Sequence, residues 1–362
     1  MSQRVWNFNP GPAVLPLTVL EKAREEMTDY KDTGMSVVEH SHRGKAYAAI
    51  HEGAKTLLAE LLGVPSNMRI LFLQGGASLQ FAMVPMNLLP AGRSADYLNT
   101  GEWSQKAIKE AKMIGTVRVA GSSEATKFDR IPAVSEISFD PKAAYVHITS
   151  NNTIYGTQWP SFPDPSPVPM VADMSSDILS RAFDIRPFGL IYAGAQKNLG
   201  PSGVTVVIIR DDVLAACRKD LPTMLRYPVH TDNDSLFNTP PTFGIYLMKL
   251  VLEWVKSQGG LKTIEAQNRE KGKLLYKTID DAKDFYKGTV QPDSRSLMNA
   301  PFRLPSEDLE AKFIAEAQAA RFVGLKGHRS VGGIRVSMYN AMPLEGIKAL
   351  TDFMVEFAKK NG

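Results

Sequence analysis

A single lysine, Lys197, stands where an apolar run ends and a turn rich in glycine begins. The apolar residues 190–193 precede it, and after the turn at 200–203 the chain continues as a second apolar run, 204–209. Apolar neighbours remove water from an amine, which lowers its pKa and makes it a nucleophile toward aldehydes. We therefore expect Lys197 to lie at a strand end and to form a Schiff base. The same pattern also fits a lysine exposed in a loop.

A carboxylate, Asp173, closes another apolar run, 168–172, and precedes Lys197 by 24 positions (197 − 173). That separation is enough for a crossover between neighbouring parallel strands. Pyridoxal phosphate needs an acid opposite its ring nitrogen, so that the protonated ring can take up electrons, while a lysine holds its aldehyde. The pair predicts a site for this cofactor. The alternative for Asp173 is a helix cap beside Ser175 and Ser176.

A strand, two glycines and a helix follow one another over residues 70–88, which is typical of an anion site. Gly75 and Gly76 permit a close approach of the backbone, and the helix that follows directs free N–H groups at an anion. An ordinary turn would have the same pattern. Trp103 offers a flat face for a pyridine ring, and Thr153 could bond a ring hydroxyl, although they equally fit a core tryptophan and a turn residue. The fingerprints of dinucleotide and P-loop sites are absent.

The elements that position these residues alternate between strands and helices. We expect an N-terminal arm, 1–16, that packs with a smaller domain, a large domain, 17–258, and that smaller C-terminal domain, 259–362, divided at a Gly-Gly pair. The large domain should hold a mostly parallel sheet covered by helices, and the small one should be α+β. Expected elements include helices at 16–30, 243–258, 261–282 and 306–322, and strands at 116–120, 144–149, 300–304 and 332–338.

The composition fits a soluble protein of about two domains: the 362 residues are 44% hydrophobic and 22% charged. The net charge of +4 is mild, and no basic run interleaved with aromatic residues indicates nucleic-acid binding. No apolar run approaches a membrane span, and no apolar leader is recognisable. The single cysteine, Cys217, is expected to be a core thiol on a helix and fits a reducing, cytoplasmic compartment. We expect no metal site.

Seven motifs, in order along the whole chain, resemble the phosphoserine aminotransferase family of fold-type I pyridoxal-phosphate enzymes. They are FNPGP (8–12), SHRG (41–44), GGASLQF (75–81), ADMSS (172–176), YAGAQKN (192–198), FNTPP (237–241) and GHRSVGG (327–333). The resemblance implies that Lys197 carries the cofactor and that Asp173 meets its ring nitrogen. It also implies stacking by Trp103 and a place near the ring hydroxyl for Thr153.

The resemblance also implies how the cofactor phosphate is held. Ala77, Ser78 and Gln196 would bind it, and Asn238 and Thr239 match positions that reach it from the neighbouring subunit, which implies a homodimer with shared sites. Some relatives have an arginine directly after the two glycines of the anion site, whereas this chain has Ala77 and Ser78 there. Phosphate binding would then depend on N–H groups, hydroxyls and the helix dipole.

Five cations are candidates for substrate binding: His42, Arg43, His328, Arg329 and Arg335. They come from opposite ends of the chain, and a cleft between two domains could bring them together. Arg335 matches the family arginine that forks an α-carboxylate, and the others suit a phosphate or a distal carboxylate. The implied reaction converts 3-phosphohydroxypyruvate and glutamate into phosphoserine and 2-oxoglutarate in serine biosynthesis. Whether 4-phosphohydroxythreonine is also a substrate, for pyridoxine synthesis, stays open.

Two other kinds of protein remain compatible with these residues. One is another aminotransferase of small amino acids, or a desulfurase, of the same fold; a desulfurase would need a mobile catalytic cysteine. The other is a regulatory protein that binds the cofactor without turnover. The pair of Lys197 and Asp173 argues against the regulatory protein, and an assay of turnover distinguishes an enzyme from such a regulator.

Overall fold

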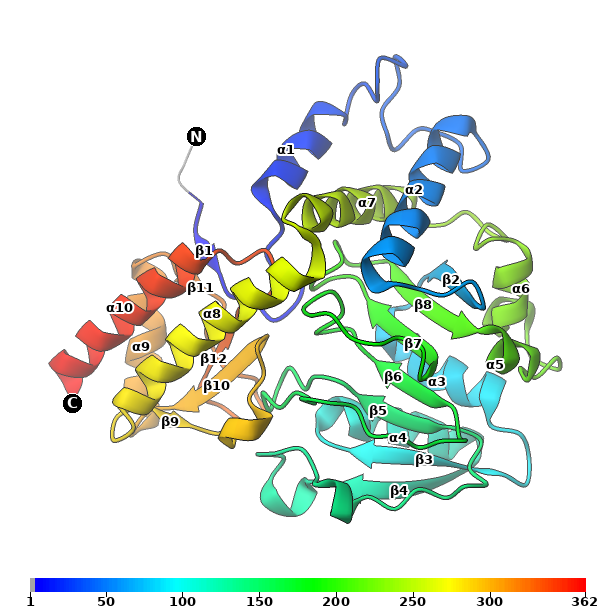
Figure 1. Cartoon of the computed structure of the whole chain (residues 1–362). Helices are drawn as coiled ribbons and strands as arrows, with labels where there is room; N and C mark the ends of the chain where they lie inside the picture. The colour runs from blue at the N-terminus through cyan, green and yellow to red at the C-terminus, as the bar shows by residue number, and fades with distance from the viewer. Residues whose placement is uncertain (1–3) are drawn as a thin grey trace.

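A seven-stranded sheet forms the centre of the computed structural model, which describes residues 4–362, so that residues 1–3 of the predicted arm lie outside the described residues (Figure 1). Across the sheet the strands are β2 (Met68–Leu73), β8 (Thr205–Arg210), β7 (Phe188–Gly194), β6 (Met170–Asp173), β5 (Val146–Thr149), β3 (Ser94–Asn99) and β4 (Thr116–Ser122). β8 is antiparallel to both of its neighbours, and the other adjacent pairs are parallel. The mostly parallel sheet predicted from the sequence is confirmed.

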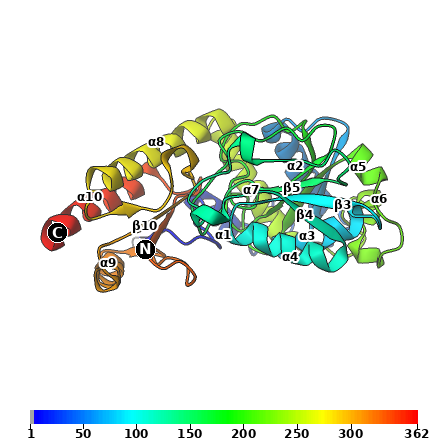
Figure 2. The same ribbon diagram turned by 90° about the horizontal axis from the view of Figure 1, so that it is seen from below.

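Helices cover both faces of this sheet. α2 (Lys45–Leu62) and α7 (Thr242–Ser257) pack on one face, and α3 (Gly76–Leu88) and α4 (Glu102–Ile114) pack on the other (Figure 2). Along β2, Ile70 and Phe72 join the first cluster, whereas Leu71 and Leu73 join the second. Strands that are buried on both faces are continuous apolar runs, which is why the sequence shows them clearly.

The carboxyl ends of three strands bring the candidate residues to one edge of the sheet. Asp173 is the last residue of β6, and Lys197 lies three positions beyond the end of β7 at Gly194. β6 and β7 are parallel neighbours, as the spacing of Asp173 and Lys197 predicts. β2 runs in the same direction and ends at Leu73, just before α3 begins, so the anion cup opens at this edge as well. Ligands of open α/β sheets bind at this edge.

A second core surrounds a three-stranded sheet in the C-terminal part of the chain, at the left of Figure 1. It consists of β9 (Lys287–Gly288), β10 (Asn299–Arg303), β12 (Ile334–Ser337), α8 (Gly260–Asp281), α9 (Glu307–Ala319) and α10 (Leu344–Asn361). β1 (Trp6–Asn7) pairs with β11 (Phe322–Val323), which brings the N-terminal segment against this part. The domain divisions at 16/17 and 258/259 stay predictions. The remaining helices are α1 (Leu17–Glu25), α5 (Asp211–Ala215) and α6 (Tyr227–Asp232).

Two local predictions are wrong. α1 ends at Glu25 rather than near Tyr30. The Tyr30 N–H donates to the Met35 carbonyl at 2.8 Å, so the chain turns back in a loop there instead of continuing the helix. Tyr30 is nevertheless buried, because it packs edge-on against Tyr246 of α7 from the loop. Cys217 is buried as predicted, but it lies two residues beyond the end of α5.

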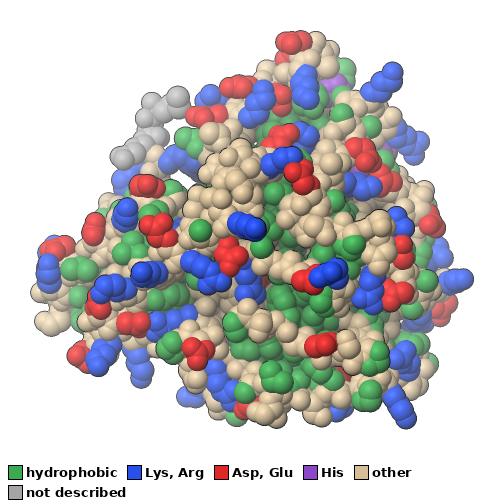
Figure 3. Space-filling view, viewed as in Figure 1, with side chains coloured by type: hydrophobic (Ala, Val, Ile, Leu, Met, Phe, Trp, Pro, Cys, Tyr) green, Lys and Arg blue, Asp and Glu red, His purple; other side chains and the backbone are tan. Residues whose placement is uncertain are grey.

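The surface is mixed in charge. On the face shown in Figure 3, basic and acidic side chains are interspersed and form no continuous basic patch. Among residues 4–362, no helix combines the length and the apolar character needed to cross a bilayer.

Candidate active site

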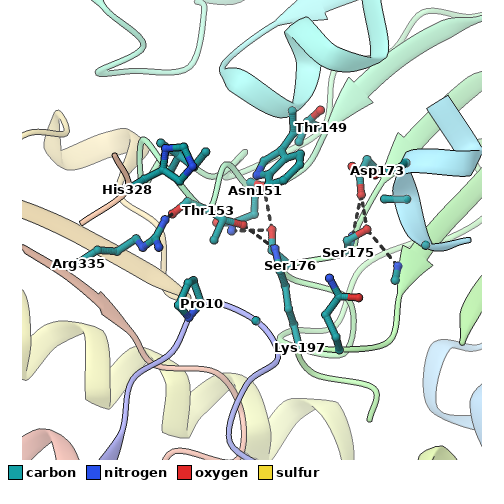
Figure 4. A pocket seen from close by; sticks show the side chains of 18 of the residues that line it. Pro10, Thr149, Asn151, Thr153, Asp173, Ser175, Ser176, Lys197, His328 and Arg335 are labelled. Carbon is teal, nitrogen blue, oxygen red and sulfur yellow. Dashed lines mark hydrogen bonds between the residues drawn. The ribbon is translucent and has the colours of Figure 1, made fainter. Parts of the chain in front are cut away.

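A cavity of about 450 Å³ opens at the carboxyl edge of the large sheet, and His328 and Arg335 from the C-terminal part of the chain also line it. In Figure 4, Lys197 projects between Asp173 on one side and Arg335 and His328 on the other. The remaining lining residues are Pro10, Gly11, Gly75, Gly76, Ala77, Ser78, Trp103, Thr149, Asn151, Thr153, Ile154, Ser175, Ser176, Gly194 and Gln196.

Lys197 has the environment of a reactive amine. It is 9% exposed, and its Nζ donates a hydrogen bond to Thr153 Oγ1 at 2.6 Å. Burial lowers the pKa of Lys197 to about 8; Asp173 opposes this effect, and the charge of Arg335 adds to it. An amine with this pKa is substantially neutral near pH 8 and can act as a nucleophile or as a base. Its Nζ lies 6.0 Å from the centre of the Trp103 ring.

Asp173 is held in one orientation by the turn that follows it. The Ser175 backbone N–H and hydroxyl donate to Asp173 Oδ1 at 2.9 and 2.6 Å, and the Ser175 hydroxyl in turn accepts from the Gly194 N–H at 3.0 Å. Burial raises the pKa of Asp173, whereas the hydrogen bonds from Ser175 and the charge of Lys197 act against this. The chain therefore presents a fixed carboxylate to the cavity beside the lysine.

The start of α3 forms an anion cup of backbone amides. Gly75 and Gly76 have φ of 86° and 63°, which side chains disfavour, and a Cβ on Gly75 would lie 2.6 Å from the side chain of Leu79. No side chain caps the first turn of α3. The first N–H groups of a helix have no partner within it, so those at Ala77 and Ser78 suit a phosphate.

Arg335 of β12 brings a cation to the opposite side of the cavity. It is 6% exposed, its Nη1 donates to the Thr153 carbonyl at 3.4 Å, and its Nε has no hydrogen-bond partner among residues 4–362. Burial lowers the pKa of Arg335, although a guanidinium stays charged. A buried cation without an anion is costly, so Arg335 is suited to receive a carboxylate. Burial and the charge of Arg335 also lower the pKa of His328.

The other candidate residues do not line this cavity in the single chain. Arg43, Arg329 and Thr239 are exposed and His42 is partly buried. Asn238 lines a different pocket, between β2, α3 and α6. Within one chain, His328 and Arg335 therefore line the cavity together, whereas His42, Arg43 and Arg329 do not line it. Arg329 adjoins His328, and its charge contributes to the lowered pKa of that histidine.

Some residues at or behind the cavity were not identified from the sequence. Asp177 is buried behind the site, where Ser150 donates to Oδ1 and Gln158 donates to Oδ2 at 3.0 Å. A Cβ on Gly11 would lie 3.3 Å from Lys197 Cε, so the arm closes over the lysine. Gly11 belongs to a recognised motif, and Asp177 follows another by one residue. Neither signal by itself indicates a place at the site.

The residues of the cavity fit pyridoxal phosphate. An amine with a lowered pKa lies beneath an aromatic ring, a fixed carboxylate stands on one side, and uncapped helix amides stand near it. Gly194 adjoins the groups expected to hold the phosphate, since a Cβ there would lie 3.3 Å from Gln196 Oε1 and 3.7 Å from the Ala77 nitrogen. The amine would hold the aldehyde, and the aromatic ring would stack on the cofactor ring. The carboxylate would meet the ring nitrogen, and the helix amides would bind the phosphate.

Comparisons with known proteins agree with this arrangement. The family model for class-V aminotransferases matches residues 5–350. The chain is 58% identical over 361 residues to a phosphoserine aminotransferase of Lysinibacillus sphaericus, with 100% of both chains covered. Its structure is similar to that of phosphoserine aminotransferase from Bacillus circulans subsp. alkalophilus, with a TM-score of 0.98, 55% identity and 100% of both chains covered. It is also similar to phosphoserine aminotransferase with bound pyridoxal phosphate from Trichomonas vaginalis, with a TM-score of 0.93, 40% identity, and coverage of 97% of this chain and 100% of that one.

Proposed function

Because the chain belongs to the class-V aminotransferase family, and within it to the phosphoserine aminotransferases, we propose the following roles for its residues in that reaction. The enzyme transfers an amino group from glutamate to 3-phosphohydroxypyruvate, giving phosphoserine and 2-oxoglutarate, and it uses pyridoxal phosphate. The assignment of roles depends mainly on one observation. The amine of Lys197 is buried between Asp173 and Arg335, and its pKa is lowered to about 8.

Lys197 and Asp173 divide the chemical work. When bound, the cofactor supplies an electron sink for the electrons of the bond broken at the substrate Cα. Lys197 would hold the cofactor aldehyde, and its Nζ could move the proton at the substrate Cα, for which a pKa near the working pH is favourable. Asp173 would keep the ring nitrogen protonated, and the amides of Ala77 and Ser78, with Gln196, would hold the phosphate. Trp103 covers one face of the ring.

Arg335 orients both substrates. Phosphoserine and glutamate present the same α-carboxylate, and Arg335 is a buried guanidinium whose Nε has no partner among the described residues. A charge-assisted fork from Arg335 would fix the Cα atom near the Lys197 amine. His328 lies beside Arg335 in Figure 4, where it can meet the distal anion of either substrate.

We further propose a homodimer in which each subunit completes the site of its partner. Asn238, Thr239, His42 and Arg43 do not reach the cavity of their own chain. Exposed apolar side chains flank the two segments that carry them: Met35 and Val38 lie before the first, and Phe237 starts the second. Exposed apolar residues beside functional motifs fit a subunit interface. In the partner's site, Asn238 and Thr239 would bind the cofactor phosphate, and the cations would bind the substrate phosphate.

The structure gives no support to a desulfurase. Cys217 is buried in the cluster beneath α3 and α4, does not line the cavity, and burial raises the pKa of its thiol to about 12. A thiol of this kind is an inert core residue rather than a nucleophile. A cytoplasmic location is also part of our proposal, since a single reduced cysteine suits that compartment.

A panel of amino acids tests the function directly. The purified holoenzyme is mixed with phosphoserine, glutamate, alanine, cysteine and 4-phosphohydroxythreonine in turn, and the absorbance of the cofactor is followed. Phosphoserine and glutamate should each convert the cofactor to its amino form. The keto acid of the other substrate should then return the cofactor to its aldehyde form. A response to alanine or cysteine without one to phosphoserine would reject the proposal, and release of sulfide from cysteine would identify a desulfurase. Absence of turnover with every amino acid would identify a regulator.

A further inference from the structure

A charged cluster connects segments 41–43 and 237–239, whose residues do not line the cavity of their own chain. Asp234 lies four positions before Asn238, and its carboxylate packs against α2, where Lys55 donates to Oδ1 and His51 Nε2 lies 3.4 Å from Oδ2. His51 is 1% exposed, and the Tyr47 hydroxyl lies 3.3 Å from its Nδ1. Figure 1 shows the connection from α6 to α7 passing beside α2.

The turn at Asp234 has a demanding conformation that several hydrogen bonds fix. Asp234 and Ser235 have φ of 49° and 61°, in the left-handed region that side chains disfavour. The Ser235 N–H donates to the His230 carbonyl at 2.7 Å, and its hydroxyl accepts from the Phe72 N–H of β2 at 2.9 Å. These contacts set the direction in which the chain leaves toward Asn238.

The same helix that receives Asp234 carries the other segment at its first turn. α2 begins at Lys45, directly after His42, Arg43 and Gly44, and the Gly44 carbonyl accepts from the Ala48 N–H at 3.0 Å. His51 lies about two turns along this helix. An α-helix is rigid over this length, so fixing Asp234 to α2 also fixes the segment at Asn238 relative to Arg43.

The ion pair is persistent. Although burial alone would raise the pKa of Asp234, the neighbouring His51 and Lys55 lower it to about 2. The carboxylate is thus ionised at any pH at which the enzyme works. The negative charge that Asp234 presents to Lys55 therefore remains in place during turnover.

We propose that Asp234, His51 and Lys55 are positioning residues that hold segments 41–43 and 237–239 as one unit, so that both enter the partner's site together. This inference depends on the shared homodimer proposed above. Asp234 then acts on the cofactor and substrate of the other subunit, at a site to which its own side chain makes no contact.

The first test measures cofactor affinity and kinetics of Asp234→Ala and Asp234→Asn homodimers. The dissociation constant of pyridoxal phosphate should rise about tenfold, near the lower limit for loss of one charge-assisted hydrogen bond. The KM for phosphoserine should also rise, with little change in kcat at saturating cofactor and substrate. Glu60→Ala is the matched control, because it removes another ion pair of α2, with Lys256 of α7, that is remote from both segments. Parental affinity and KM in both Asp234 variants would overturn the proposal.

The second test asks in which subunit the defect appears. Hybrid dimers of an Asp234→Ala chain and a Lys197→Ala chain, isolated by two different tags, contain one site with an intact Lys197 and an intact Asp234 loop. That site should have the parental KM and cofactor affinity. A parallel hybrid of a Thr239→Ala chain with the Lys197→Ala chain tests the shared dimer itself.

The outcomes separate the two proposals. Parental KM and cofactor affinity in both hybrids would support a positioning role of Asp234 in the site of the partner subunit. Recovery with Thr239→Ala but not with Asp234→Ala would leave the shared dimer standing and restrict the cluster to folding of its own subunit. Recovery in neither hybrid, with hybrid formation verified, would reject the shared dimer and this inference with it.

Discussion

The burial of the Lys197 amine predicts a pH dependence of stability in the protein without cofactor. Burial lowers the pKa of Lys197 from 10.5 to about 8, and each pKa unit corresponds to about 1.4 kcal/mol. Below pH 8 the amine is protonated in both the folded and the unfolded state. Burial of the charged amine then lowers the free energy of unfolding by about 3 kcal/mol. Between pH 8 and 10.5 the unfolded chain binds more of this proton, so the free energy of unfolding rises with pH.

The Lys197→Met variant isolates this effect, because methionine removes the titrating group and keeps an unbranched side chain. Both proteins, free of cofactor and at one concentration, are unfolded with denaturant between pH 7 and pH 9.5 and followed by tryptophan fluorescence. The stability advantage of the variant should shrink by about 2 kcal/mol across this range. Lys271, a second buried lysine with a pKa of about 7, is present in both proteins and cancels. A difference in stability that does not change with pH would refute the desolvation of Lys197.

Three further predictions concern the charges of the site. Asp173→Asn should lower turnover about a hundredfold or more, while the cofactor still attaches to Lys197; parental turnover would contradict its role. Arg335→Gln should raise the KM of phosphoserine and of glutamate by similar factors, roughly ten- to hundredfold, measured at one ionic strength; an effect on one substrate only would exclude a contact with the shared α-carboxylate. Arg43→Gln and Arg329→Gln should lower kcat/KM for phosphoserine more than for glutamate, and an unchanged ratio would show that neither arginine binds the phosphate.

The large sheet could be predicted because its strands are buried on both faces and therefore appear as apolar runs. The neighbouring position of β6 and β7 followed from the spacing of Asp173 and Lys197. β1, β9 and β11 could not be found, since strands of two residues have no periodicity and depend on tertiary pairing. The early end of α1 was missed because Tyr30 continues the apolar spacing of a helix, although it is buried from a loop by its packing against Tyr246.

The candidate site was predictable where the chemistry of the cofactor or substrate asks for one particular kind of side chain, such as an amine, an acid, a flat ring or a guanidinium. Lys197 and Asp173 line the cavity together, as do Trp103 and Arg335. Asp177 was missed because burial of a carboxylate behind the site depends on Ser150 and Gln158, which are distant in sequence. A sequence also does not show which subunit a side chain serves.

The most direct test of the proposed active site is to identify the lysine that carries the cofactor. Borohydride reduction of the holoenzyme, followed by peptide mapping, should place the pyridoxyl group on Lys197. The informative rival is Lys271, which is 2% exposed and has a pKa of about 7. Its Nζ, however, donates to the carbonyls of Met338, Tyr339 and Met342. We expect label on Lys197 and none on Lys271. Label on Lys271 or on any other lysine would contradict it.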